Sequence, residues 1–193
     1  MKQKNILVSK VSNRNRNVDY LAYAQQYKEL IELIISKKEY NGHDYEFIPL
    51  LFIFSRYLEL SFKGLNYHLN SQGHNTNFGN QFGHDLDGPF KELTKQKLVR
   101  KYIILKRDIN FKEITMFVSL LNDLNKPNGQ GLMYPEDKNG ISNENSKKFS
   151  SSFKHLNDPK KLFKMINIVM HWLENVEGDL DKNLLDELDK NRN

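Results

Sequence analysis

The segment from Leu51 to Leu65, LFIFSRYLELSFKGL, predicts a helix that is apolar on almost every side yet carries three charges. A helix of that kind packs at the centre of a bundle. Arg56, Glu59 and Lys63 are spaced three and four residues apart, so they share one helical face and Glu59 can reach both cations. Either this face is a solvated stripe of paired charges, or it lines a polar cleft that binds a ligand.

The rest of the chain predicts further helices and no strands, because apolar residues recur with the helical period of about 3.6. Residues 126–152 show no such period, and a segment of that length is either disordered or a functional loop. The sequence therefore predicts an all-α bundle of about five helices, with a long irregular loop before the last main helix. We expect the helices at residues 19–38, 47–69, 89–105, 110–124 and from 159 to about 176.

The 193 residues are enough for one domain with an ample core. We expect a helical bundle domain over residues 18–178, preceded by a basic arm (1–17) and followed by a short acidic tail (179–193). The arm alone carries the excess charge. Removing its five cations from the 29 Lys and Arg leaves 24, which equals the 24 Asp and Glu of the chain. The five are Lys2, Lys4, Lys10, Arg14 and Arg16.

Two interpretations of this arm remain open: a flexible segment that contacts nucleic-acid phosphates, or an ordinary solvated end. The chain has no cysteine, which excludes disulfides, thiolate metal ligands and a cysteine nucleophile. It also has no apolar run near the roughly 18 residues of a membrane helix, and no apolar core of a signal peptide. We therefore expect a cytoplasmic protein with no membrane partner.

Two further motifs contain candidate functional residues. In GHDLDGPF, Asp85 is suited to cap the following helix, and His84 beside it is a candidate general acid or base. In GLMYPEDKNG, Tyr134 and Asp137 are candidate ligand contacts, but the acidic residues lack the spacing of a calcium loop. We find no phosphate-binding glycine loop and no paired-histidine motif, so we expect neither a metal nor a cofactor.

The order of these features resembles the HEPN-like helical proteins of bacterial defence and toxin neighbourhoods. The resemblance covers about Pro49 to Gly140, through PLLFIFSRYLELSFKGL, then GHDL, then Tyr-Pro-Glu-Asp-x-x-Gly. It implies a helical bundle that forms a homodimer, with polar residues at a cleft, and in active members a metal-independent RNase. Such members pair an Arg with a His a few residues later on one helix. Here the next histidine after Arg56 is His68, twelve residues on, so that motif is absent.

Three functions remain possible from the sequence. The cleft binds RNA, a nucleotide or another anionic ligand without turnover. Alternatively it is an RNase, in which Arg56 and Lys63 hold the phosphate, His84 is the general base, and Glu59 or Asp85 orients groups. In the third, the polar residues form a buried structural network in a protein-binding module of the immunity or antitoxin kind. In each, we expect Arg56, Glu59, Lys63 and His84 to form one connected cluster.

If the arm binds nucleic acid, it acts through phosphates, and five cations give a salt slope of roughly −4 to −5 on duplex DNA. Deleting residues 1–17 should then flatten the dependence of log K on log salt concentration, measured by fluorescence anisotropy. An unchanged slope would assign the arm no part in binding.

Overall fold

The computed structural model describes residues 20–36, 47–73, 76, 83–96, 99, 110–125 and 158–190, with the side chains of 47 and 183–190 left aside. This part of the chain contains no strand, which confirms the predicted all-α class. None of its helices combines the length and the apolar character that crossing a membrane requires. The helices are α1 (Tyr20–Ser36), α2 (Phe47–Ser71), α3 (Asp87–Lys95), α5 (Phe111–Leu124) and α7 (Pro159–Lys190).

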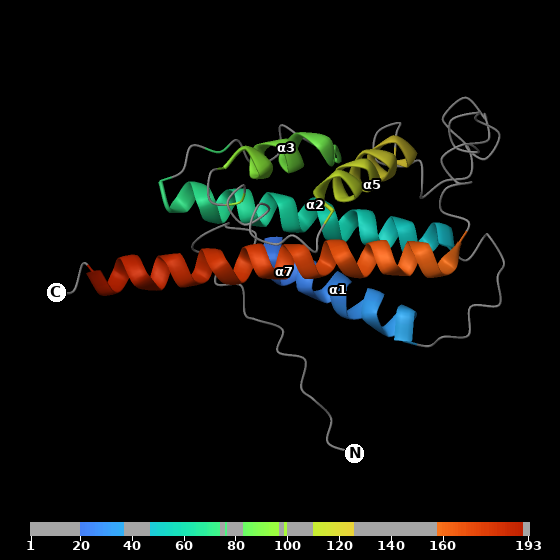
Figure 1. The fold of residues 1–193 in the computed structure, drawn as a ribbon, viewed down its shortest axis with the longest axis horizontal. Helices are drawn as coiled ribbons and strands as arrows, with labels where there is room; N and C mark the ends of the chain where they lie inside the picture. The colour runs from blue at the N-terminus through green and yellow to red at the C-terminus, as the bar shows by residue number, and fades with distance from the viewer. Residues whose placement is uncertain are drawn as a thin grey trace, which may run out of the picture.

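Helix α2 is the central element of the bundle (Figure 1). Helices α1 and α7 lie on one side of it, and α3 and α5 lie on the other. Helix α7 runs in the same direction as α2, whereas α1 runs antiparallel to it. The buried residues of α2 are distributed around most of its circumference, as expected for a helix that other helices enclose on several sides.

Aromatic side chains connect the two sides of the bundle. Phe90 of α3 lies with its ring centroid 5.3 Å from that of Phe62, 5.8 Å from that of Phe111 and 5.9 Å from that of Trp172. These rings come from four different helices, and burying each such side chain stabilises the fold by about 1.5–3 kcal/mol. Phe90 thereby fixes the start of α3 against α2, α5 and α7.

Most helix starts agree with the sequence prediction. Pro49 lies in the first turn of α2, where its missing N–H has no helical partner. Asp158 caps α7, because its Oδ1 accepts hydrogen bonds from the backbone N–H of Lys160 (3.0 Å) and Lys161 (3.4 Å). At the start of α5 the Asn110 side chain makes no cap and instead donates to Glu113 Oε1 at 2.9 Å.

Two helix ends differ from the prediction. Helix α3 ends at Lys95 rather than near residue 105, because Gln96 turns to an extended conformation with φ −66° and ψ 133°. Helix α7 continues to Lys190 rather than ending near Val176, since Leu180 continues its buried face. The predicted acidic tail therefore begins as helix. The long loop predicted over residues 126–152 lies outside the described residues.

Helices α1 and α2 approach each other closely at Gly64. A methyl group on Gly64 would lie 2.7 Å from Cγ and Cδ2 of Leu21 and 3.2 Å from the Leu21 backbone nitrogen. Contacts that short cannot be relieved by a side-chain rotation alone, because backbone is involved. Glycine at position 64 therefore sets the distance between the two helices.

We expect Gly64→Ala to destabilise the protein although alanine favours helix by about 1 kcal/mol. Forcing a methyl group into a packed contact costs about 1–3 kcal/mol, which should exceed that gain. The matched control is Gly178→Ala in α7, where an added Cβ meets nothing within 4 Å. This control should gain about 0.5–1 kcal/mol. Urea unfolding monitored by circular dichroism measures the stability of both variants. If Gly64→Ala gained as much stability as Gly178→Ala, α1 would have moved away from α2 at no cost.

Candidate functional site

One face of α2 is polar along most of the helix. Arg56, Glu59, Lys63, Asn66 and Asn70 follow one another at spacings of three and four residues, and we call these residues the polar stripe. The chain after α2 folds back along this stripe. Asn70 donates to the Thr76 carbonyl (3.2 Å), and the Thr76 hydroxyl donates to the Asn66 carbonyl (2.7 Å). Much of the stripe is thus covered by the chain itself rather than by water.

The charged residues of the stripe meet His84 at the start of α3. Arg56 Nη1 donates to Glu59 Oε2 at 2.7 Å, and Lys63 Nζ donates to Glu59 Oε1 at 2.8 Å. Arg56 Nη1 also lies 2.6 Å from His84 Nδ1. The structure thus brings together the four side chains that the sequence predicted as one connected cluster. We call Arg56, Glu59, Lys63 and His84 the charged cluster.

The charged cluster is buried at one end and open at the other. The side chains of Glu59 and Lys63 are each 8% exposed and that of Arg56 is 14% exposed, whereas His84 is 51% exposed. The Arg56 guanidinium also lies over the Phe52 ring, 5.1 Å from its centroid, in a cation–π contact. Two cations therefore share one carboxylate, and the cluster reaches solvent at its His84 end.

The Glu59 carboxyl is held in its ionised form. Burial alone would raise its pKa, but the hydrogen bond and charge of Lys63 and the hydrogen bonds from Arg56 and His84 outweigh burial. The net result is a pKa below the ordinary value of 4.5. A carboxylate in this position is a permanent anion at neutral pH, and it holds both cations in place.

The segment that presents His84 is fixed by backbone hydrogen bonds. Lys63 Nζ donates to the Gly83 carbonyl at 2.6 Å, and Gly83 has the left-handed φ of 52° that glycine tolerates best. The Leu86 N–H donates to Asn122 Oδ1 of α5 at 2.9 Å. Asn66 Nδ2 donates to the Pro89 carbonyl at 2.8 Å. His84 is therefore presented by a segment that α2 and α5 anchor from both sides.

Sequence reasoning missed Asn66 and Asn122 as residues that position the site. Asn66 had a detectable signal, because it continues the spacing of the polar stripe past Lys63 on an otherwise apolar helix. Asn122 had none, since its partner Leu86 lies far away in the chain and only the fold brings them together.

Asp85 is the one other predicted site residue that lies within the described residues. Asp85 lies one residue before the N-cap of α3, and its Oδ2 accepts the Gly88 N–H of the first turn at 2.9 Å, as a capping side chain does. This is the structural alternative that the sequence left open for it. The remaining candidates lie outside the described residues and stay predictions; they are Tyr134, Asp137, Lys2, Lys4, Lys10, Arg14 and Arg16.

The tautomer of His84 decides which of its two neighbours the ring bonds. Arginine can only donate hydrogen bonds, so a bond between Arg56 Nη1 and Nδ1, at 2.6 Å, requires the neutral ring to carry its hydrogen on Nε2. A hydrogen on Nδ1 would instead donate to the Glu59 oxygens at 3.2 and 3.3 Å. The shorter Arg56 contact favours the first tautomer, in which the half-exposed ring has a donor at Nε2.

No protein-family model, curated protein or solved structure matches the chain. Within the described residues, no group of three or more His, Asp or Glu side chains is placed to hold a metal ion. The chemistry of the charged cluster itself is therefore the basis for a functional proposal.

We expect the stabilisation provided by Glu59 to depend on pH. Because folding lowers the Glu59 pKa, its contribution is complete above the ordinary value of 4.5 and is lost as pH falls through the lower folded value. Glu59→Gln removes the carboxylate that both cations contact and should cost about 3 kcal/mol at pH 7. The difference between parent and variant should shrink on acidification below that value.

Urea unfolding between pH 7 and pH 3 measures this difference. The control is Glu29→Gln, which removes an exposed carboxylate on α1 and should change stability by less than about 0.5 kcal/mol throughout. A Glu59→Gln penalty that did not vary with pH would show that Glu59 acts through packing rather than charge.

Proposed function

We propose that the charged cluster binds a phosphate group of RNA or of a nucleotide, without turnover, through Arg56 and His84. The observation that carries this proposal is the contact between Arg56 Nη1 and His84 Nδ1. When Arg56 donates to Nδ1, the neutral ring presents a hydrogen-bond donor at Nε2, at the open end of a cluster that holds two cations and one carboxylate. Phosphate oxygens accept from such donors, and charge-assisted hydrogen bonds are the stronger class.

The charge balance of the cluster also supports an anionic ligand. Within the charged cluster, Arg56 and Lys63 carry two positive charges and Glu59 carries one negative charge. The field of these three groups therefore favours an anion at the His84 end.

The same geometry argues against hydrolysis by His84 as general base. A general base needs an unprotonated nitrogen within reach of the substrate proton. In the tautomer that the Arg56 contact favours, the unprotonated nitrogen is Nδ1, which faces Arg56 at 2.6 Å, and Nε2 carries the hydrogen. Glu59 is likewise engaged by both cations. Binding without turnover therefore fits the site better than an RNase mechanism.

We also propose that the chain is a HEPN-like protein, as the resemblance in its sequence implies. An all-α bundle with polar residues gathered at one place is what that resemblance implies. A role in bacterial defence or stress response and a homodimeric state would follow from it. The basic arm would then add phosphate contacts to those of the charged cluster.

The proposal predicts that His84→Ala lowers affinity for phosphate ligands while the protein stays folded. His84 is half exposed, so its loss should cost less than about 1 kcal/mol of stability. Losing one hydrogen bond to a charged group should weaken binding by about 1.5–3 kcal/mol, roughly tenfold to a hundredfold. The matched control is His171→Ala on α7, whose side chain is 67% exposed. Binding of labelled single-stranded RNA, of AMP and of inorganic phosphate is measured by anisotropy or calorimetry.

Arg56→Lys tests the second contact. Lysine keeps the charge but lacks the planar guanidinium, so phosphate binding should fall although Glu59 retains a cation. RNA binding with little affinity for AMP would favour a polymer ligand, and similar affinities would favour a nucleotide. RNA cleavage that His84→Ala abolishes would instead establish the RNase alternative. Unchanged binding in both variants would leave the charged cluster as a structural network.

A further inference from the structure

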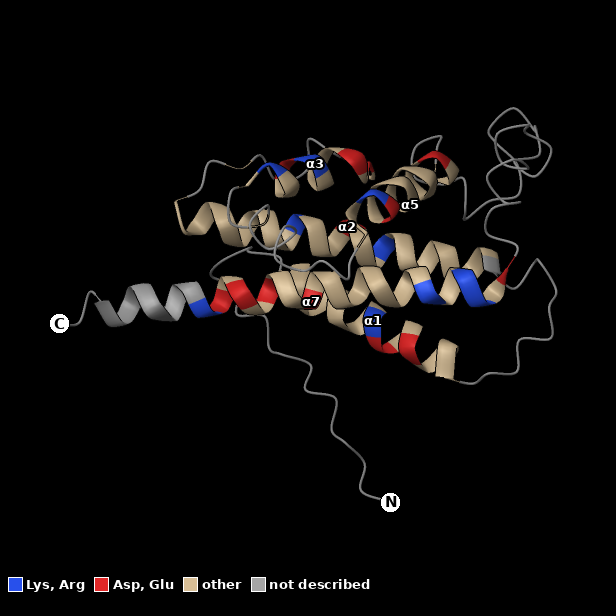
Figure 2. Ribbon diagram, viewed as in Figure 1, with Lys and Arg blue, Asp and Glu red and all other residues tan. Residues whose placement is uncertain are grey.

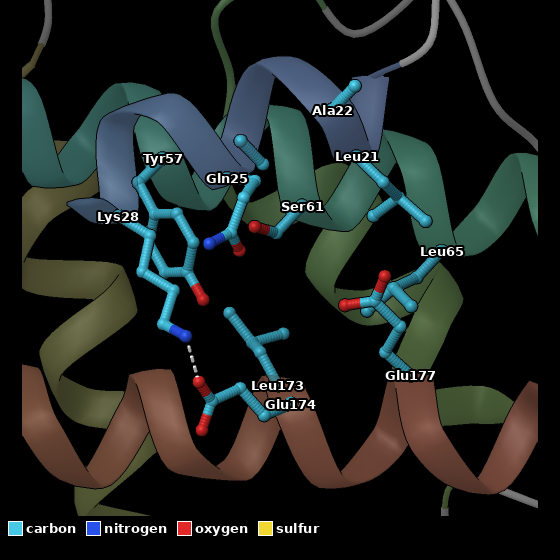
Figure 3. A pocket seen from close by; sticks show the side chains of 11 residues that line it. Leu21, Ala22, Gln25, Lys28, Tyr57, Ser61, Leu65, Leu173, Glu174 and Glu177 are labelled. Carbon is cyan, nitrogen blue, oxygen red and sulfur yellow. Dashed lines mark ion pairs between the residues drawn. The ribbon is translucent and has the colours of Figure 1, made fainter. Parts of the chain in front are cut away.

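A second polar site lies on the face of α2 opposite the charged cluster. A cavity of about 330 Å³ is enclosed by α1, α2 and α7 (Figure 3). Its α2 wall is formed by Tyr57, Ser61 and Leu65, which the 100° rotation per residue places on the other side of the helix from Arg56 and Lys63. This volume is at the lower end of the range for small-molecule sites, about 300–1,000 Å³. The cavity is distinct from the phosphate site proposed above.

The acidic groups of this cavity differ in their partners. Glu174 forms an ion pair with Lys28 of α1, drawn as the dashed line in Figure 3. Glu177, one turn further along α7, has neither an ion pair nor a hydrogen bond among the described residues. Figure 3 shows its carboxylate extending from α7 toward Leu65 of α2. One cation and two carboxylates thus line the cavity, so it has a net negative charge.

The environment of Glu177 makes its unpaired state costly. Burial, followed by the nearby charge of Asp181, raises the pKa of this carboxyl above its ordinary value, and the charges of His68 and Lys28 only partly oppose this effect. The ionised carboxylate would therefore gain from a cation brought close to it. A bound cation would supply the counter-charge that the described residues do not give Glu177.

The other residues that line the cavity indicate what kind of cation it could bind. Tyr57 is 4% exposed, and burial raises the pKa of its phenol, which stays neutral. Its oxygen and the Ser61 hydroxyl can accept hydrogen bonds. Leu65 and Leu173 supply apolar walls on two helices. This combination suits an ammonium group attached to a short hydrocarbon body, whereas a carboxylate or phosphate would be repelled by Glu174 and Glu177.

We propose that this cavity binds a small primary amine, with its ammonium group on the Glu177 carboxylate and its hydrocarbon body against Leu65 and Leu173. The ammonium has three hydrogens to donate, and Glu177 can accept more than one of them. The Lys28–Glu174 ion pair closes the α1 side of the cavity and stays in place.

Phenethylamine is the probe, and 2-phenylethanol, which has the same shape but no charge, is its control. Titration of the 193-residue chain, followed by calorimetry or by NMR, should show that the amine binds at least tenfold more tightly than the alcohol. Glu177→Gln should weaken amine binding at least tenfold and leave the weak binding of the alcohol unchanged. This variant removes an unpaired half-buried charge, so it should melt no lower than the parent.

The matched control is Asp181→Asn, which removes the same charge from α7 at a residue that does not line the cavity. It should weaken amine binding much less than Glu177→Gln does, by about twofold to threefold, because Asp181 acts on the site through its charge alone and its side chain is 60% exposed. Equal losses in both variants would show only a general electrostatic attraction and would overturn the proposal. So would equal binding of amine and alcohol, or no saturation by about 10 mM amine. The phosphate-binding variant His84→Ala should bind the amine as the parent does, so the two proposals fail independently.

Discussion

The pairing of Glu59 with Arg56 and Lys63 is the interaction on which the arrangement around α2 depends. A carboxylate on an otherwise apolar central helix is tolerable only if charges and hydrogen bonds satisfy it. Arg56 and Lys63 do so from the same helical face, at 2.7 and 2.8 Å. Lys63 then reaches the Gly83 carbonyl and Arg56 reaches His84, so the charges that stabilise Glu59 also hold the next segment of the chain.

The separation of charge across α2 follows from this arrangement. The face toward α3 holds an excess positive charge, and the face toward α1 and α7 holds an excess negative charge. Figure 2 shows the acidic residues of α7 in its C-terminal half and basic residues near its N-terminus. Helix α2 thus separates a region of positive charge on its α3 side from a region of negative charge on its α1 and α7 side. Apolar side chains fill most of the space between these two faces of the helix.

Local helical geometry explains what could be predicted from the sequence. Arg56, Glu59 and Lys63 could be expected to meet because spacings of three and four residues place side chains on one face in any helix. His84 could be added only as a hypothesis, since its approach depends on how the chain turns after α2. Asn122 and the Lys28–Glu174 pair escaped prediction, because they join segments far apart in the chain. The end of α7 was placed too early because the tail's charges obscured Leu180, which continues the buried face.

The close approach at Gly64 has a consequence for the cavity. Leu21, the residue that a methyl group on Gly64 would strike, is also part of the cavity wall. The width of the cavity therefore depends on how closely α1 approaches α2 at Gly64. Any larger residue at position 64 would act as a spacer and open the cavity on its α1 side. The size of amine that the proposed site accepts could thus be changed by a substitution at position 64, a residue that does not line the cavity.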